Sequence, residues 1–469
     1  MTSVNFETTA TVTLEIPQIT SPPSILSPSP RITKNEIRTS LKASTLDAVF
    51  AAVFSLTTGG ILLSNFLVEL DASPVVFGML SSIPMVVNLI QPLGAYISER
   101  TTSRFQYSLQ THGLGRVLWL ILVLGIAGWK WGGVTSHQLV VLTLSIVLFS
   151  HLLGGLGSAS WLSWLAMIVP RKLRGRYFGI RNSAASLTNL LCLPLAGLAV
   201  SHWQGGTLQG YGVVLFLCII FGIVSLGCQY FKADVNPQLQ NTVCNYPVQD
   251  EFSGELICSS NTIPSQNQLL SSIWKNTNFL IFLLYFSFWM FAVNLSAPFF
   301  TLYMLDTLNL DISWVSLYSS LQAGANLLML MLWGKLADKI GNRPILLFVG
   351  ILVAVTPLLW FGISNNHLGL WLWLPLLHIL TGGTWAAIDL CTNNMQLGIV
   401  PIKNQSIYFA MPTASAAIAA AMAGAGGALG TTLGSLLVQF TNCGGLLGLF
   451  ALSGLLRLVA LVPLIFLQE

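Results

Sequence analysis

Long apolar runs alternate with short polar segments along most of the chain. About 20 apolar residues cross the hydrocarbon core of a bilayer as a helix. Twelve runs of that size can be placed, with six on either side of a polar central stretch. The pattern therefore predicts an all-α integral membrane protein with 12 transmembrane helices. The runs cover residues 47–68, 74–97, 108–130, 138–168, 182–202, 211–231, 277–304, 312–333, 344–363, 370–398, 407–438 and 444–467.

Two polar segments divide the chain. Residues 1–45 include the Ser/Pro-rich stretch 21–30 and are predicted to be a disordered cytoplasmic tail. Residues 232–273 are rich in Asn, Gln and acids and are predicted to be a cytoplasmic linker. The membrane part then consists of two six-helix bundles, at residues 46–231 and 274–469.

The composition agrees with a membrane protein. Hydrophobic types make up 54% of the 469 residues, charged types 8%, and the mean hydropathy is +0.73. A soluble domain carries about 25% charged residues, so the composition excludes a soluble enzyme or a nucleic-acid binder. The net charge of +4 is too small to indicate a polyanionic partner, and the seven cysteines contain no C-x-x-C pair. We therefore expect them to be small buried side chains and not metal ligands.

The basic residues predict the orientation. Most of the 20 Lys and Arg residues lie in the tail, the linker and alternate loops. Cytoplasmic loops carry an excess of these residues. Both termini are therefore expected in the cytoplasm, with the protein in an inner or plasma membrane.

The two halves also resemble each other. Residues 70–77 match residues 310–317, and Ile168-Val169-Pro170 matches Ile399-Val400-Pro401. Because each half has an even number of spans, the copies have the same orientation, so the bundles are pseudo-symmetric. Parallel repeats related by an axis along the membrane normal are an architecture of transporters.

One loop carries a recognisable motif. Residues 334–343, GKLADKIGNR, resemble the loop signature of the major facilitator superfamily between spans 8 and 9. The first-half counterpart, 94–104, is degenerate, with Ser98 in place of the Asp and Glu99 as the nearest acid. Residues 170–179 also resemble that family's loop 4–5. The resemblance covers residues 46–469 and implies a transporter with a central cavity, without identifying the solute.

The resemblance further implies a latch that breaks when the inner side opens. In it, Asp338 would face the positively charged start of span 5. Solvated topology markers are the alternative, which we favour for Glu99 and Arg100. The residues assigned to this gating set are Gly334, Asp338, Gly341, Arg343, Gly94, Glu99, Arg100, Arg174, Gly175 and Arg176.

Ionisable residues inside spans are functional candidates, because burying a charge is costly. Asp389 could bind a cation, carry a coupled proton or pair with Arg457; a purely structural acid is the alternative. For Arg116 and Arg457 we favour structural pairing over substrate contact. His151 and His378 could titrate near neutral pH, although a plain hydrogen-bonded role is favoured for both.

Aromatic and amide residues complete the candidate pocket. Trp161, Trp289 and Trp385 offer broad apolar faces with one donor, and Asn294 and Asn393 offer amides. Ordinary packing is the alternative for each of them. The small residues Gly59-Gly60, 154–157 and 423–434 are expected to let helices approach closely.

The sequence predicts a secondary active transporter that moves a small amphipathic organic solute by alternating access. We expect proton coupling, with export favoured over import, and a monomer whose partners are the bilayer, the solute and the coupling proton. No cofactor or metal is expected, since the chain has no phosphate-binding loop and no H-E-x-x-H motif. The alternatives are a transport-inactive sensor or assembly factor of the same fold, and a membrane enzyme acting on lipid.

Overall fold

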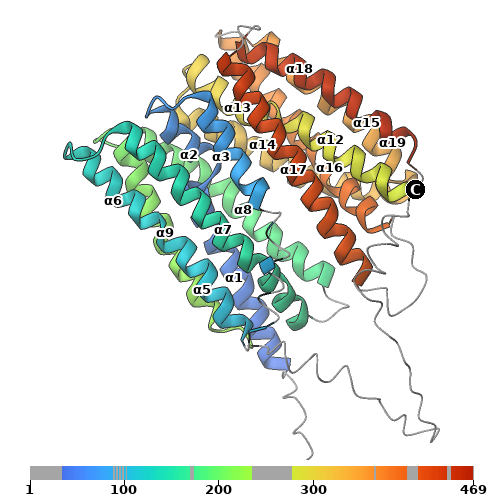
Figure 1. The fold of residues 1–469 in the computed structure, drawn as a ribbon, viewed down its shortest axis with the longest axis horizontal. Helices are drawn as coiled ribbons and strands as arrows, with labels where there is room; N and C mark the ends of the chain where they lie inside the picture. The colour runs from blue at the N-terminus through green and yellow to red at the C-terminus, as the bar shows by residue number, and fades with distance from the viewer. Residues whose placement is uncertain are drawn as a thin grey trace, which may run out of the picture.

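The chain is described here by a computed structural model, in whose described residues helices joined by short turns form all of the regular secondary structure (Figure 1). These residues are 34–87, 90, 93–94, 97, 100–101, 103–169, 174–234, 277–363, 366–398, 410–440 and 445–467. Eleven of its helical segments are long and apolar enough to cross a membrane, and one shorter apolar helix, Pro74–Val87, lies at the predicted second span. Together they correspond to the twelve predicted runs.

The two halves are built from equivalent sets of helices. In the first half they are α1 (Lys34–Thr58), α2 (Gly60–Val68), α3 (Pro74–Val87), α5 (Arg104–Val117), α6 (Trp119–Lys130), α7 (Ser136–Ile168), α8 (Arg174–Ser201) and α9 (Thr207–Gln229). In the second half they are α12 (Thr277–Asn294), α13 (Ala297–Leu302), η3 (Tyr303–Thr307), α14 (Ile312–Ile340), α15 (Asn342–Val355), η4 (Thr356–Gly362), η5 (Gly369–Trp373), α16 (Leu374–Gly398), α17 (Ala410–Phe440), α18 (Gly445–Ala460) and α19 (Val462–Ile465).

The first helix starts earlier than the sequence pattern predicts. It begins at Lys34, so residues 34–45 are helical and the predicted bundle boundary at 46 is too late. The residues that follow α9 contact α1: Lys232 Nζ lies 2.7 Å from Asp47 Oδ2 in a buried ion pair. The amide of Ala233 also donates to Ser40 Oγ at 3.0 Å. The first residues of the predicted linker thus hold the early turns of α1 in the bundle.

The first span of each half is broken at an equivalent place. Gly60 adopts a left-handed backbone conformation (φ +62°) between α1 and α2, and the chain breaks at Leu295 and Ser296 between α12 and α13. A β-carbon at Gly59 or Gly60 would meet open space. The expectation of close helix packing at this pair is therefore wrong, and Gly60 instead supplies the turn.

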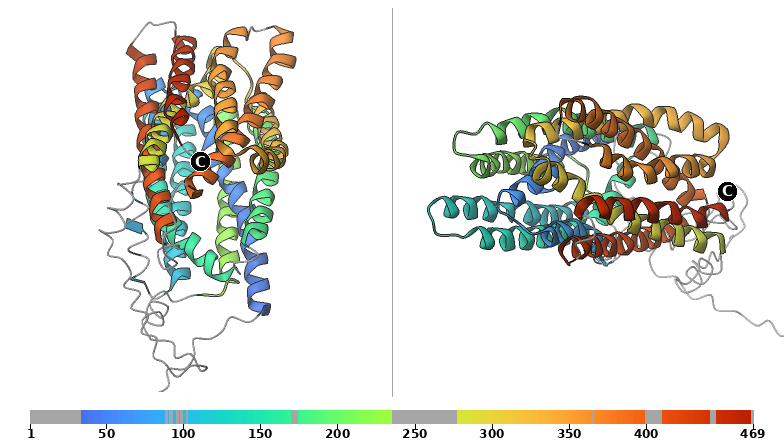
Figure 2. Two further views of the ribbon diagram at one scale, coloured as in Figure 1. Left: turned by 90° about the vertical axis from the view of Figure 1, so that its right-hand side faces the viewer. Right: turned by 90° about the horizontal axis from the view of Figure 1, so that it is seen from above.

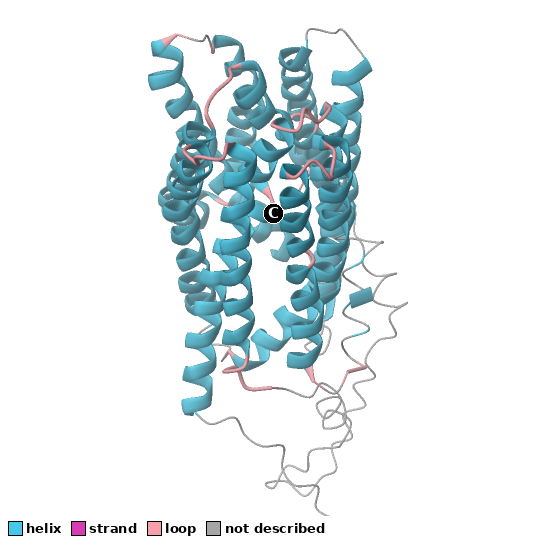
Figure 3. Cartoon of the chain, turned by 90° about the vertical axis from the view of Figure 1, so that its left-hand side faces the viewer, coloured by secondary structure: helices cyan, strands magenta, loops and turns pink. Residues whose placement is uncertain are grey.

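The helices run between two ends of the molecule. We call the end where α1 begins, α9 ends and α12 begins the linker end, and the opposite end, with the turns at 69–73, 202–206 and 308–311, the far end. Figure 3 shows the helices running lengthwise through the molecule. The first half (blue to green) and second half (yellow to red) lie side by side in Figure 1 and in the right-hand view of Figure 2.

Two helix pairs, α3 with α17 and α8 with α14, form most of the contact between the halves, and α2 and α3 make smaller contacts with α14 and α13. A β-carbon on Gly78 would lie 2.6 Å from Ser435 Cβ, and one on Gly197 would lie 2.6 Å from Ser316 Oγ. Ser82 and Thr431 share a hydrogen bond across the first pair. At the far end of the second pair, Ser201 Oγ donates to Asp311 Oδ2 at 2.6 Å. The halves therefore meet closely from the far end to about the middle of these helices.

A row of glycines on α17 confirms the predicted close packing there. β-carbons on Gly426, Gly430 and Gly434 would overlap the backbone carbonyls of Ser287, Phe291 and Leu295 respectively. Both sets are spaced by four residues, so one face of α17 lies against the backbone of the seventh span. Small residues permit this approach, which dispersion then stabilises.

We predict that Gly430→Val destabilises the protein by about 1–3 kcal/mol, because the added methyl groups would separate α17 from α12. Thermal unfolding in detergent measures the change. Gly227→Val is the matched control, since a β-carbon at Gly227 meets nothing nearby. Equal melting temperatures for the two variants would contradict the packing argument.

Candidate functional site: a cleft between the halves

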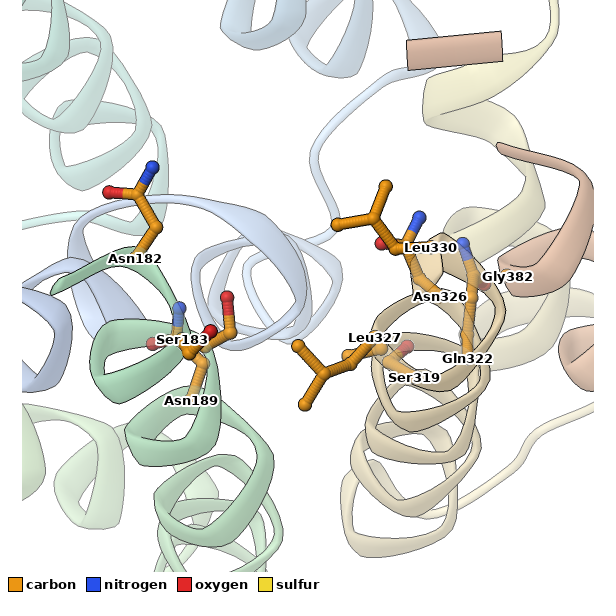
Figure 4. Close-up of a pocket in the computed structure, with 11 residues that line it drawn as sticks. Asn182, Ser183, Asn189, Ser319, Gln322, Asn326, Leu327, Leu330 and Gly382 are labelled. Atoms are coloured by element: carbon orange, nitrogen blue, oxygen red, sulfur yellow. The ribbon is translucent and has the colours of Figure 1, made fainter. Parts of the chain in front are cut away.

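A cleft of about 470 Å³ lies between α8 and α14, with Gly382 of α16 at its side (Figure 4). Its walls are mostly uncharged hydrogen-bonding side chains. A β-carbon on Gly382 would overlap the carbonyl oxygen of Gln322, so α16 packs directly against this part of α14. The lining residues are Asn182, Ser183, Ser186, Asn189, Ser319, Gln322, Ala323, Asn326, Leu327, Leu330 and Gly382.

These polar residues follow helical spacing. One face of α8 carries Asn182, Ser186 and Asn189. One face of α14 carries Ser319, Gln322 and Asn326 in the same way. The buried Oδ1 of Asn189 has no hydrogen-bond partner in the described part of the chain. None of these residues was predicted from the sequence, although polar residues at intervals of three and four within apolar spans indicate such a face.

The far end of the cleft is closed by the contacts between α8 and α14. The Asp311 carboxylate also accepts a hydrogen bond from the amide of Ser313 at 2.8 Å and so caps α14. Burial of Asp311 opposes its ionisation, but hydrogen bonds from Ser201 and Ser313 outweigh burial and lower its pKa. An ionised Asp311 therefore both starts α14 and holds the end of α8.

Asp389 lies on the side of α16 that faces the interior. His378, Gly382, Trp385 and Asp389 are spaced by four, three and four residues, which places them on one helix face. The other three line cavities. The Asp389 side chain is exposed and has no hydrogen bond or ion pair within the described residues. The Asp389–Arg457 pair considered from the sequence is thus not formed.

Each half has an intramembrane arginine that links its third and sixth spans by binding a backbone carbonyl, but the arginine lies on opposite members of the pair in the two halves. Arg116 of the third span donates from Nη1 to the carbonyl of Gly222 in the sixth. Arg457 of the twelfth span donates from Nη1 to the carbonyl of Val353 in the ninth, at 2.9 Å. Each arginine therefore joins the same helix pair of its half. Arg457 also lines a second cavity, next to Trp385.

The remaining pocket candidates do not gather at the cleft. Trp289 is fully buried in the core of the second half, and Asn294 donates to the carbonyl of Met290 at 2.8 Å. Trp161 lies near the linker end, where Arg181 lies over its ring at 4.5 Å. His151 is half-buried on α7. Of the residues singled out from the sequence, His378, Trp385 and Arg457 line a second cavity, described below.

The signature residues that the structure describes have structural contacts. Gly94 packs against the backbone of Leu156, and Gly341 ends α14 with φ +85°. Arg343 donates from Nε to the carbonyl of Leu464 at 3.2 Å, at the end of α19. Gly334 lies within α14, and Arg100 is exposed. The residues predicted to form the latch lie outside the described part of the structure: Glu99 is not described, and neither are the side chains of Asp338, Arg174 and Arg176. Gly175 is described only by its backbone. The side chain of the pocket candidate Asn393 is also not described.

Neither cavity contains a metal-binding arrangement. Across the residues that the structure describes, no three His, Cys, Asp or Glu side chains come together in a way that could hold an ion. The cleft walls offer amides and hydroxyls, which can bind a polar solute by hydrogen bonds without fixing a charge. The arrangement is suited to reversible binding.

A family profile for the Major Facilitator Superfamily matches residues 48–415. The chain belongs to this superfamily. It is therefore a multi-pass membrane transporter and not an enzyme. No curated protein matches the sequence closely enough to count as a relative.

Solved transporter structures share the fold. The nucleoside transporter NupG (D323A mutant) superposes with a TM-score of 0.66 at 13% identity, covering 92% of this chain and 100% of its own. A D-xylose-proton symporter gives 0.66 at 15% identity, with 92% and 98% covered. The inward-open xylose transporter XylE from E. coli gives 0.63 at 15% identity, with 92% and 96% covered. At these identities the likeness establishes the fold alone.

We predict that Gly197→Trp weakens closure of the far end, because an indole cannot fit against Ser316. A cysteine introduced at Ser319, in the cleft, should then react faster with a membrane-impermeant thiol reagent added from the far-end side. Gly227→Trp, at a position with open space, should leave the rate unchanged. Unaltered labelling in Gly197→Trp would contradict the closure.

Proposed function

We propose that the chain is a secondary active transporter that moves a small organic solute by alternating access. The observation that carries this proposal is the polar cleft between two halves that meet from the far end to mid-helix. A bound solute would be released toward the linker end in this state. Rocking of the halves about the α3–α17 and α8–α14 contacts would then expose the cleft to the far end.

The lining supports a solute with hydrogen-bonding groups and an apolar part. Asn, Ser and Gln side chains on α8 and α14 can both donate and accept hydrogen bonds. Leu327 and Leu330 supply apolar surface in the same cleft. The basic residues near the linker end support placing that end in the cytoplasm, and export remains the favoured direction.

A proton gradient is the proposed energy source, with Asp389 as the proton carrier. Its exposed carboxyl lies on the α16 face that also carries Gly382 of the cleft. Without a partner among the described residues, it can be protonated or ionised without breaking an ion pair. Protonation would allow the neutral side chain to enter a drier environment as the halves close.

We predict that Asp389→Asn abolishes solute accumulation driven by a pH gradient while leaving solute exchange intact. Proteoliposomes containing a pH-sensitive dye, tested with a panel of small organic solutes, measure both fluxes. Asp306→Asn is the control, because that exposed acid lies in η3 at the far end.

Two outcomes would count against the proposal. Accumulation that ignores the pH gradient, or that survives in Asp389→Asn, would remove the proton coupling. Absence of flux for every solute in the panel, from protein that is folded by its thermal unfolding profile, would favour a transport-inactive sensor or assembly factor of this fold.

A further inference from the structure

A second cavity lies inside the second half and is bordered by a buried arginine side chain. It has a volume of about 280 Å³ and is formed by the seventh, eighth, ninth, tenth and twelfth spans. Ser319 and Gln322 of α14, which are labelled in Figure 4, line both this cavity and the cleft. The two spaces therefore adjoin at these side chains. The Arg457 guanidinium forms part of the wall.

Arg457 has donors but no counter-ion among the described residues. It is 3% exposed, and its hydrogen bonds go to neutral oxygens: the Val353 carbonyl at 2.9 Å, Ser296 Oγ at 3.0 Å and the Val293 carbonyl at 3.4 Å. Its buried Nε has no hydrogen-bond partner among the described residues. Asp47 and Lys232 of the first half, by contrast, form a buried ion pair. Arginine remains protonated in proteins, so this site holds an uncompensated positive charge beside a cavity.

The corresponding arginine of the first half is in a different setting. Arg116 also donates to a backbone carbonyl, that of Gly222, but the negative charge of the Asp47 carboxylate stabilises its positive charge. Arg116 lines neither the cleft nor the second cavity. An arginine can therefore join two helices without bordering a cavity and with a carboxylate nearby. Arg457 differs in both respects, because it borders a cavity and has no carboxylate partner among the described residues.

The rest of the cavity wall favours an anion with an apolar body. Among the described residues the wall contains no carboxylate, while Gln322 and Trp385 can donate hydrogen bonds. His378 Nδ1 lies 2.8 Å from the Leu374 carbonyl, which can only accept, so Nδ1 donates there and Nε2 of the neutral ring can only accept. His378 therefore supplies no donor to an anion. Phe300 and Trp360, stacked with ring centroids 4.8 Å apart, supply an aromatic surface.

We propose that this cavity binds the carboxylate of a small organic acid, with Arg457 as the anion-binding residue and the aromatic wall holding the apolar body. This inference rests on the proposed transport function and deepens it, because it names the class of solute. The volume lies just below the roughly 300–1,000 Å³ of typical ligand sites, which limits the ligand to a small molecule. Entry is from the cleft, past Ser319 and Gln322.

Benzoate and benzamide are the matched probes, since they share one shape and differ in charge. Their affinities for the purified full-length protein can be measured by calorimetry and by tryptophan fluorescence. We expect benzoate to bind at least about tenfold more tightly than benzamide, because a charge-assisted hydrogen bond is lost with the amide. Equal affinities, or no binding of benzoate, would overturn the proposal. Competition by inorganic phosphate as strong as that by benzoate would also overturn it.

The variants separate ligand binding from packing. Arg457→Gln should lose the preference for benzoate, and Arg457→Lys should keep part of it. Arg116→Gln, which changes the first-half arginine away from the cavity, should bind benzoate normally. If Arg457→Gln does not fold, Gln322→Leu provides the second test, with a several-fold weaker affinity expected. An unchanged preference in a folded Arg457→Gln, or an unchanged affinity in Gln322→Leu, would contradict the assignment.

The binding assay is independent of transport. Benzoate binding that depends on Arg457, in a protein without solute flux, would support the anion site and count against the transport proposal. Proton-driven flux of neutral solutes, with no preference for benzoate over benzamide, would do the reverse.

Discussion

The contact between small residues of the two halves is the constraint on which the rest of the structure depends. Gly78 lies against Ser435, and Gly197 lies against Ser316, with too little room for a β-carbon on either glycine. These contacts bring the helix backbones together from the far end to mid-helix. Further toward the linker end, α8 and α14 border a cleft between the halves, and that cleft is the candidate transport site.

The same constraint explains why two pairs of helices carry the interface. A shared apolar surface gives little driving force inside a bilayer, because lipid is equally apolar, so close packing and a few hydrogen bonds must hold the halves together. The bonds Ser82–Thr431 and Ser201–Asp311 fulfil that role. Such contacts are few and individually modest, which suits an interface that must open and close.

Buried charges are handled differently in the two halves. Moving an ion into a low-dielectric interior costs several kcal/mol even after relaxation. In the first half, Asp47 and Lys232 pair at 2.7 Å, and Arg116 lies within their field. In the second half, Arg457 relies on neutral oxygens and borders a cavity. The asymmetry between otherwise equivalent bundles is where we locate the specific function of this chain.

The sequence could predict the spans, the repeat and the family, because apolar length and loop motifs are local properties. It could not separate Trp289, buried in the core, from Trp385, which lines a cavity, since both lie in apolar runs. Asp47 and Lys232 are far apart in the chain, so their pairing has no local signal, and the same is true of the bond from Ala233 to Ser40 near the start of α1. The polar faces of α8 and α14 were readable from their helical spacing, but only helix packing shows that they face each other.

The central claim is that closure at one end of the molecule is coupled to opening at the other. Electron–electron double resonance on two pairs of spin labels tests it directly: Ile180 with Ile340 near the linker end, and His202 with Asn309 at the far end, all of which are exposed. Across conditions of pH and solute, we expect the first distance to shorten as the second lengthens. Distances that stay fixed, or that change in the same direction, would contradict alternating access in this protein.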